Sequence, residues 1–413
     1  MSEDLLEIAD SIWSGEVSME EKHPMAIPGQ LLEVRPGVAF VSGFSNAIAF
    51  DTGDGLVLID SGGFLQPDYV HGHVRGWSDQ PLRFAIYTHG HVDHVFGVGP
   101  FDSEPGEPVV IGHENVPPRF DRYVLTAGYN SVINQRQFQV PGLQWPTEYR
   151  FPDITYRDDY VLEHGDLRFE LYHAKGETDD HTWVWVPDRR VLCCGDLFIW
   201  CSPNAGNPQK VQRYPREWAE ALRAMQDVGA EVLLPGHGLP VVGTARIQEA
   251  LDSTASYLES ICDQSLALMN EGLSLDEIVA RVEPPAELAA KPFLQPIYDE
   301  PDFIVRNLWR LYAGWYDGDA SRLKPSAPGE LDSALVGLVG GVEPLVAEAR
   351  RRADAGELAL ACELIEIAHA AAPDDADVKT ARSDIYARRS KVERSTMAKG
   401  VYAWAAAESS ASG

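Results

Sequence analysis

The chain has 413 residues, 45% of them hydrophobic, which is enough for two or three domains with a sizeable core. Its 34 Lys and Arg against 63 Asp and Glu give a formal net charge of −29, which disfavours nucleic acid and anionic lipid as partners. Five cysteines without framework spacing, no signal-peptide pattern and no apolar run near the roughly 18 residues of a membrane span predict a cytoplasmic protein.

Short apolar runs dominate the N-terminal half. Residues 31–61 read as a β-hairpin around the turn sequence DTGDG and end at Asp60. Further strands are predicted at 82–88, 108–113, 167–173, 182–187, 190–196 and from 231. Residues 215–230 show helical periodicity, with Pro215 in the first turn and Gly229 at the end. The side chains suited to chemistry follow the ends of several of these strands.

Helices replace strands after about residue 245. Residues 246–271, 273–282 and 301–318 read as helices, and prolines separate the last two. RLKPSAPGE, at 322–330, has the composition of a linker. Residues 331–406 are Ala-rich and helical, and they fit either one helix-turn-helix repeat or a simple helical bundle.

The sequence THGHVDH, at 88–94, places three histidines and an aspartate directly after a predicted strand. His89 and His91 alternate and can reach one ion, whereas Asp93 and His94 are displaced by the turn and can serve a second ion nearby. Neutral imidazole suits zinc or iron, and a carboxylate can bridge two ions. The motif therefore predicts a site for two divalent cations, with Zn²⁺ first and Mn²⁺ or Fe²⁺ as alternatives.

This motif resembles the metallo-β-lactamase superfamily, over residues 31–245. The resemblance implies an αββα sandwich, an α/β fold with the metals at one edge of its two sheets. Asp60, in VLIDSG, would orient a ligating histidine or fix its hairpin. Asp196, in CCGDLF, matches the bridging residue, and His237, in LLPGHG, matches the last ligand. The implied metal ligands are His89, His91, Asp93, His94, Glu177, Asp196 and His237, and Asp93, Asp60 and Arg213 are expected to act in catalysis.

The third ligand position departs from most of the superfamily, which has a histidine there. The matching stretch reads HAKGETDDHTW, so the resemblance assigns Glu177, in the loop after a strand. His173 and His181 lie close by and are the other candidates. A carboxylate at this position makes the site more anionic and can admit manganese or iron as well as zinc.

A glutamate at this position is similar to the alkylsulfatase branch of the superfamily. GFSNAIAFDTGDGLVLIDSG resembles the first hairpin of that branch, and RYPREWAEAL, at 213–222, resembles the segment whose leading arginine binds sulfate. That arginine would be Arg213, unless it is a solvated residue at a helix start. FIVRNLWRLYAGWYDGDASRLKP, at 303–325, resembles the dimerisation helix. The departures are Asp319-Ala320, in place of Asn-Pro, and Asp196, in place of Glu; no counterpart of the sterol-carrier-like domain is expected.

The resemblance divides the chain into a catalytic domain over 1–250, a helical dimerisation segment over 251–325 and an α-helical region over 326–413 with one helix-turn-helix-like repeat. Within the first, residues 114–160 are a long insertion and are expected to act as a substrate lid. Its aromatic residues either favour an apolar or aromatic substrate or bury the insertion on the domain; they are Tyr123, Tyr129, Phe138, Trp145 and Tyr149. A homodimer, or a hetero-oligomer with a related subunit, is expected.

The resemblance implies a binuclear metal-dependent hydrolase in which a hydroxide held between the metals cleaves an ester-type C–O or S–O bond. An alkyl sulfate is the leading substrate. An aryl ether, as in O-demethylation, and an aryl ester or lactone are alternatives, because water activation alone does not select the electrophile. Outside enzymes, the alternative is a non-catalytic metal-binding subunit of an oligomer.

Overall fold

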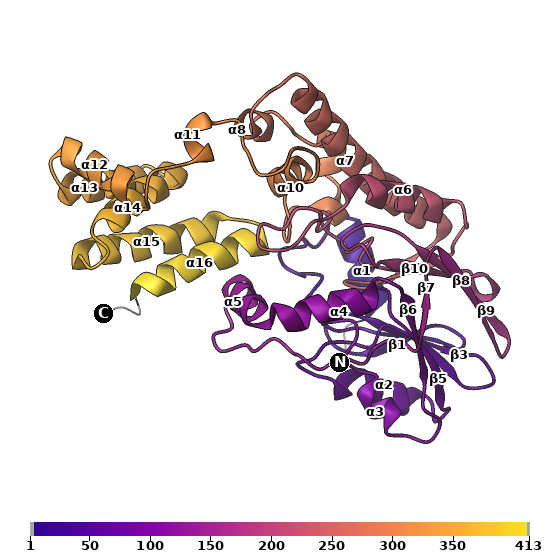
Figure 1. Cartoon of the computed structure of the whole chain (residues 1–413). Coiled ribbons are helices and arrows are strands. Elements are labelled where there is room, and N and C mark those ends of the chain that lie inside the picture. Colours follow the sequence, from indigo (N-terminus) through magenta and orange to yellow (C-terminus); the bar gives the residue numbers. More distant parts are fainter. Residues whose placement is uncertain (1–3, 411–413) are drawn as a thin grey trace. The chain divides into compact units, whose positions relative to one another are not determined.

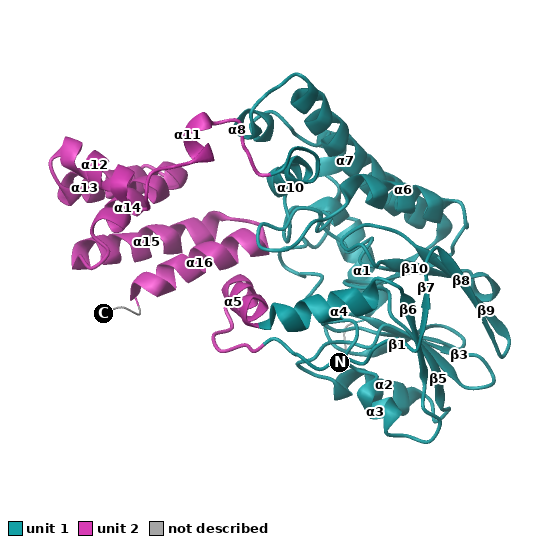
Figure 2. Cartoon of the chain, in the orientation of Figure 1, with its two compact units in different colours: residues 1–127, 145–314 teal, residues 128–144, 315–413 magenta. Residues whose placement is uncertain are grey.

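The structure is a computed structural model and describes residues 4–410. The described residues form two compact units, shown in Figures 1 and 2. The first unit contains the residues up to Ala127 and 145–314, and the second contains 128–144 and the residues from Trp315 onward. Among the described helices, none combines the length and the apolar composition that a membrane crossing requires.

A seven-stranded sheet opens the first unit, and its strands lie side by side in chain order. They are β1 (Leu31–Arg35), β2 (Val38–Val41), β3 (Ala47–Asp51), β4 (Leu56–Ile59), β5 (Leu82–Ile86), β6 (Val109–His113) and β7 (Ile154–Tyr156). The pairs from β1 to β4 are antiparallel, whereas those from β4 to β7 are parallel. Parallel pairing brings the carboxyl ends of β4 and β5 to one edge, where Asp60 and the histidine motif follow.

The second sheet has six strands in the order β13-β12-β11-β10-β9-β8. They are β8 (Asp159–His164), β9 (Leu167–His173), β10 (Thr182–Val186), β11 (Val191–Gly195), β12 (Val232–Pro235) and β13 (Val241–Val242). β11 and β12 are parallel and are joined through the helix α6 (Pro215–Gln226). Their carboxyl ends therefore lie at the same edge, and Asp196 and His237 follow them directly.

The two sheets face each other and are covered by helices. Phe50 on β3 and Phe169 on β9 are fully buried and meet edge to face, with ring centroids 5.3 Å apart. The helix α2 (Asp68–Trp77) packs Val70 and Val74 into the core of the first sheet. α7 (Thr244–Asn270) contacts α6 and the strands β12 and β13. This arrangement confirms the predicted αββα sandwich.

Helices complete the first unit. They are α1 (Leu5–Trp13), α3 (Gly99–Asp102), α4 (Val116–Leu125), α8 (Leu275–Val279), α9 (Ala286–Ala289) and α10 (Pro301–Ala313), with short 3₁₀ turns at Pro187–Arg189 and Pro292–Leu294. The helix predicted at 301–318 ends at Ala313, because Gly314 adopts a positive φ of 84°. Residues 114–160 are more regular than a lid loop: they contain α4, α5 (Ala127–Phe138) and β7.

The second unit is helical, as predicted for the C-terminal region. Besides α5 it contains α11 (Ala320–Leu323), α12 (Glu330–Val339), α13 (Val342–Asp354), α14 (Leu358–Ala371), α15 (Ala376–Val392) and α16 (Thr396–Ser410). Its core is built on small residues, among them Ala349, Ala361 and Ala381, which let neighbouring helices approach closely. Among the described glycines of this unit, Gly400 on α16 has the closest neighbour, because an added Cβ would lie 2.2 Å from the carbonyl oxygen of Gln137.

Candidate metal centre

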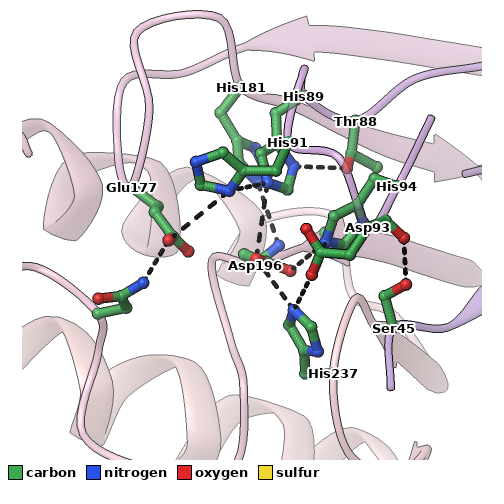
Figure 3. A network of polar contacts seen from close by, with 12 residues as sticks. Ser45, Thr88, His89, His91, Asp93, His94, Glu177, His181, Asp196 and His237 are labelled. Atoms are coloured by element: carbon green, nitrogen blue, oxygen red, sulfur yellow. Dashed lines mark hydrogen bonds and ion pairs between the residues drawn. The ribbon is translucent and has the colours of Figure 1, made fainter. Parts of the chain in front are cut away.

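The predicted ligands converge at the shared edge of the two sheets (Figure 3). Six of the seven form two groups, and within each group the ligand atoms lie within 4.8 Å of one another. One group is His89, His91 and Asp196; the other is Asp93, His94 and His237. The first sheet supplies the histidine motif, and the second supplies Asp196 and His237.

Asp196 lies between the two groups. Its Oδ2 is 3.6 Å from His89 Nε2 and 3.4 Å from His237 Nε2, while its Oδ1 is 3.4 Å from His94 Nε2. In the first group, His89 Nε2 and His91 Nδ1 are 2.9 Å apart. Both oxygens of Asp196 thus face imidazole nitrogens from different groups, which is the position that a bridging ligand needs.

The ligand atoms are placed to bind divalent cations rather than to form hydrogen bonds with one another. His94 Nε2 and Asp196 Oδ1 are buried and face each other, yet neither has a hydrogen-bond partner within residues 4–410. Buried polar atoms rarely lack a partner, so a cation between them supplies the missing interaction. Burial lowers the pKa of His89 well below its usual value, which keeps the ring in the neutral form that binds metals.

The charge balance of the site points the same way. Although burial disfavours a charged ring, the neighbouring carboxylates raise the pKa of His94 well above its usual value. These carboxylates belong to Asp196, Asp60 and Asp93. Negative charge is therefore in excess at this site, and bound cations would compensate it in place of a proton.

Asp60 contacts both a ligand and the end of β5. Its carboxylate accepts the Thr88 N–H and the Thr88 hydroxyl, each at 2.7 Å, and the Nδ1–H of His94 at 2.8 Å. The last contact directs His94 Nε2 towards Asp196. These contacts fit the first role considered for Asp60, orienting a histidine, and they tie it to the end of β5 rather than within its own hairpin.

The ring of His237 is also fixed from outside the centre. Its Nδ1–H donates to the carbonyl oxygen of Phe44 at 2.6 Å, which leaves Nε2 for the metal side. Asn46, in the first hairpin, donates to the carbonyl oxygens of Pro235 and Gly238 at 3.0 and 3.1 Å. The hairpin therefore holds the loop that carries the last predicted ligand.

Glu177 lies beside the first group. It is 3% exposed, and its Oε1 is 3.7 Å from His91 Nδ1. The same oxygen accepts Nη2 of Arg213 at 3.2 Å and also contacts Nδ2 of Asn204. Burial and, to a smaller extent, the carboxylate of Asp196 raise the pKa of Glu177 to about 8 despite the opposing charge of Arg213.

The two alternative third ligands are engaged elsewhere. His181 Nε2 accepts the N–H of Asp196 at 3.1 Å, and the ring stacks on His89 with centroids 4.9 Å apart. His173 donates through Nδ1 to the carbonyl oxygen of His181 at 3.0 Å and stacks on His113. Of the three candidates, Glu177 is the one whose carboxylate oxygen faces an imidazole nitrogen of the first group.

Arg213 is buried, so it is not the solvated helix-start residue considered as the alternative. It is 1% exposed, and its backbone N–H and carbonyl both bind the side-chain amide of Asn307 on α10. Its Nη2 pairs with Glu177, whereas Nε and Nη1 have no hydrogen-bond partner among the described residues. The guanidinium thus has spare donors beside the ligand groups.

Three residues near the centre carry no signal in the sequence. Asn204 and Asn307 reach Glu177 and Arg213 from loops and helices distant in the chain. Lys210 lies with its ammonium nitrogen 5.6 Å from the ring centroid of Trp145, and burial beside Arg213 lowers the pKa of Lys210 to about 7. None of these residue types is distinctive outside a folded context.

The predicted aromatic residues of the insertion separate into different environments. Tyr123 is buried and packs against Trp145 and Tyr149, at centroid distances of 5.4 and 6.3 Å. Trp145 also lies 6.1 Å from the ring of Phe64. Tyr129 is 65% exposed, and it belongs to the second unit, as does Phe138. Part of the insertion is therefore buried on the first unit, which agrees with the second of the two expectations for these aromatic residues.

Comparison with known proteins supports the resemblance. A family model described as the metallo-β-lactamase superfamily matches residues 41–237, the span that carries all the predicted ligands. This part of the chain is therefore a metallo-β-lactamase-type domain. A second model, described as alkyl sulfatase dimerisation, matches residues 274–412. Both matches confirm the resemblance drawn from the motifs.

The curated relatives that this chain matches include alkylsulfatases. A linear primary-alkylsulfatase from Pseudomonas sp. (strain ATCC 19151) is 29% identical over 370 residues, which cover 81% of this chain and 67% of that protein. An (R)-specific secondary-alkylsulfatase from Pseudomonas sp. is 24% identical, with coverages of 86% and 58%. An alkyl/aryl-sulfatase from Saccharomyces cerevisiae is 24% identical, with coverages of 69% and 48%. The chain therefore spans from about half to two thirds of the length of these proteins.

A solved structure shares the fold of this chain. The stereoselective inverting sec-alkylsulfatase Pisa1 from Pseudomonas sp. aligns with a TM-score of 0.84 at 22% identity, covering 92% of this chain and 65% of that one. The alignment supports the fold of the whole chain, including its helical C-terminal region. The names of the relatives agree with the enzyme class predicted from the motifs.

Proposed function

We propose that the protein is a metal-dependent hydrolase of sulfate esters, with an alkyl sulfate as the leading substrate. The observation that carries this proposal is the buried guanidinium of Arg213, which has two unpaired donor nitrogens beside the ligand groups. A sulfate monoester carries one negative charge on three acceptor oxygens, and a guanidinium fork binds such a group in a bidentate manner. A neutral ether or lactone would leave those donors unsatisfied.

In the proposed ligand set, His89, His91 and Glu177 would hold one cation, and Asp93, His94 and His237 would hold the other. Asp196, which lies between the two groups, would serve both. The mixture of imidazole and carboxylate suits Zn²⁺, with Mn²⁺ or Fe²⁺ as alternatives. When bound, such ions lower the pKa of a water molecule towards neutrality and stabilise negative charge on the reacting ester.

The protein residues position the reactants. Arg213 would hold the sulfate oxygens, and Asp60 would fix the ring of His94. The Asp93 side chain is 22% exposed, so it would also orient the attacking water at the open side of its group. Phe64 lies next to the histidine motif, because its N–H donates to the Val92 carbonyl oxygen at 3.3 Å. Its ring would contact the apolar part of the substrate.

A hydrolysis screen with parallel metal analysis tests the proposal. The substrates are dodecyl sulfate, nitrophenyl sulfate, a nitroaryl methyl ether, nitrophenyl acetate and a lactone. We expect sulfate release from dodecyl sulfate in proportion to bound metal. Turnover of the ether or of the ester without sulfate release would overturn the sulfate proposal in favour of those alternatives, and a metal-loaded protein inactive on every substrate would favour a non-catalytic subunit.

The role of Arg213 is tested by Arg213→Lys, with Arg216→Lys as the matched control. Arg216 lies in the same segment but is exposed. Losing the fork while keeping the charge should lower kcat/KM for the sulfate ester by about 100-fold, equivalent to two charge-assisted hydrogen bonds. Equal activity of both variants would contradict this role.

A further inference from the structure

A buried ion pair lies behind the centre and outside the proposed ligand set. Arg119 on α4 is 4% exposed, and Asp180, in the loop that carries Glu177, is fully buried. Arg119 Nε donates to Asp180 Oδ2 at 2.8 Å, and Nη2 contacts the carboxylate of Asp179. Removing two charges from water is costly, so a pair like this persists only where its geometry is well satisfied.

The same oxygen of Asp180 reaches the histidine motif. Oδ2 accepts the N–H of Gly90 at 3.0 Å, and Gly90 lies between the predicted ligands His89 and His91. A Cβ at position 90 would lie 2.9 Å from Arg119 Cδ and 3.0 Å from Asp180 Oδ2. The glycine of THGHVDH is therefore required by the approach of the ion pair.

Asp180 is also linked to the other ligand segments. It follows Glu177 by three residues and precedes His181. His181 accepts the N–H of Asp196 at 3.1 Å and stacks on His89 at an interplanar angle of 17°. One buried carboxylate thus connects the loops of the histidine motif, of Glu177 and, through His181, of Asp196.

We infer that Arg119 and Asp180 are positioning residues of the metal centre. Their ion pair sets the separation between the loop of His91 and the loop of Glu177, and so it sets the affinity of the first ligand group for its cation. This inference rests on the proposed ligand set and is independent of the substrate. It also gives α4, the first helix of the insertion, a supporting role at the centre.

The test uses Arg119→Lys and Asp180→Asn in the full-length protein. Lysine keeps the charge but cannot contact both Asp179 and Asp180. Asparagine can still accept from Gly90 but removes the buried counter-charge of Arg119 and leaves it paired with Asp179 only. Loss of such an outer partner lowers metal affinity by about 10–100-fold. Zinc dissociation constants, measured by chelator competition, should show this loss for one of the two bound equivalents only.

Arg75→Lys is the matched control, because Arg75 makes a comparable fork to Glu104 at 2.9 and 2.6 Å away from any ligand loop. Circular dichroism and urea unfolding of the metal-free variants identify any general loss of stability. Wild-type affinity for both equivalents in both variants, or an equal loss in the control, would overturn the inference. A wild-type protein that binds two zinc ions but hydrolyses no sulfate ester would refute the proposed function and leave this result standing.

Discussion

Glu177 stands where the resemblance to the metallo-β-lactamase superfamily leads one to expect a histidine, and its surroundings explain how a carboxylate is tolerated there. Arg213 and Asn204 donate to the same oxygen, Oε1, and they offset part of the cost of burying the charge. A histidine at this position would instead place a second potential cation against the guanidinium. The glutamate and the arginine are therefore best understood as a pair.

Removal of this carboxylate should cost one metal ion. We expect Glu177→Ala to retain about one equivalent fewer than the wild type by elemental analysis, because the first group loses its third protein ligand. Glu163→Ala, on the exposed surface of β8, is the control. Full retention of metal in Glu177→Ala would sink the assignment of Glu177 as a ligand.

Asp299 gives a pH-dependent contribution to stability. It is fully buried and accepts the N–H groups of Gly206 and Asn207, at 2.5 and 3.2 Å, in the loop that follows Asn204. Burial raises the pKa of Asp299 to about 7, although its backbone hydrogen bonds oppose the shift. Between pH 3.8, the usual pKa of an aspartate, and a pH of about 7, the folded state holds a proton on Asp299 that the unfolded state has released. The free energy of unfolding that Asp299 contributes is therefore lost as the pH rises through this window.

Asp299→Asn should remove that dependence. In metal-free protein, the free energy of unfolding of the wild type relative to the variant should fall by about 2–3 kcal/mol between pH 5 and pH 8, at about 1.4 kcal/mol per pKa unit. Urea unfolding at several pH values measures the difference. A difference that stays constant with pH would contradict the expectation.

Single residues differ in how well the sequence predicts them. The histidine motif is predictable because ligand type and spacing are local. The burial of Arg213 and the contact between Asp180 and Gly90 are not predictable, since both depend on segments that meet only in the fold. For that reason the sequence predicts the ligands but does not predict the residues that support them.

At the level of elements, strands are predicted more completely than helices. The apolar runs of β3, β4, β5 and β11 are short, continuous and bounded by turn residues. The sequence predicts neither α1 nor α2, and α2 shows the reason. It contains Gly72 and Gly76 and has little intrinsic helix propensity, so it depends on burying Val70 and Val74 against the sheet.

The glycines of α2 offer a test of that dependence. Both are exposed, and an added Cβ at either position meets no atom within 4 Å. Gly72→Ala and Gly76→Ala should each raise the free energy of unfolding by about 0.5–1 kcal/mol. Gly97→Ala should instead destabilise, because its Cβ would lie 1.8 Å from the Ser61 carbonyl oxygen. Urea unfolding with no gain in either α2 variant would refute the argument.

At the level of the whole molecule, an apolar helix stands out in the second unit. No residue of α12 is buried, and Leu331, Leu338 and Val339 are 61%, 83% and 47% exposed. Such a surface is typical of an interface, and the helix lies within the match to the alkyl sulfatase dimerisation model. We propose that α12 contributes to a homodimer; a hetero-oligomer with a related subunit is the alternative.

Light scattering distinguishes these states. The wild type at micromolar concentration should have twice the chain mass of 45.5 kDa. Leu331→Asp combined with Leu338→Asp should give a single-chain mass with an unchanged helical circular dichroism spectrum, whereas Leu360→Asp, an exposed leucine on α14, should not. A monomeric wild type would exclude the homodimer.

The domain limits at 250 and 325 and the cytoplasmic location stay predictions.

The second unit is built from two segments that are far apart in the chain, and this separation affects when the unit can fold during synthesis. This unit joins residues 128–144 to the chain from Trp315 onward, and residues 145–314 are made in between. At roughly 5–20 residues per second, α5 waits about ten to thirty seconds for its partners to leave the ribosome. Gly400, which lies against Gln137, follows it by 263 residues in the chain. The second unit can therefore be completed only after residues 145–314 have been made, and premature termination before Trp315 would leave α5 without its native partners.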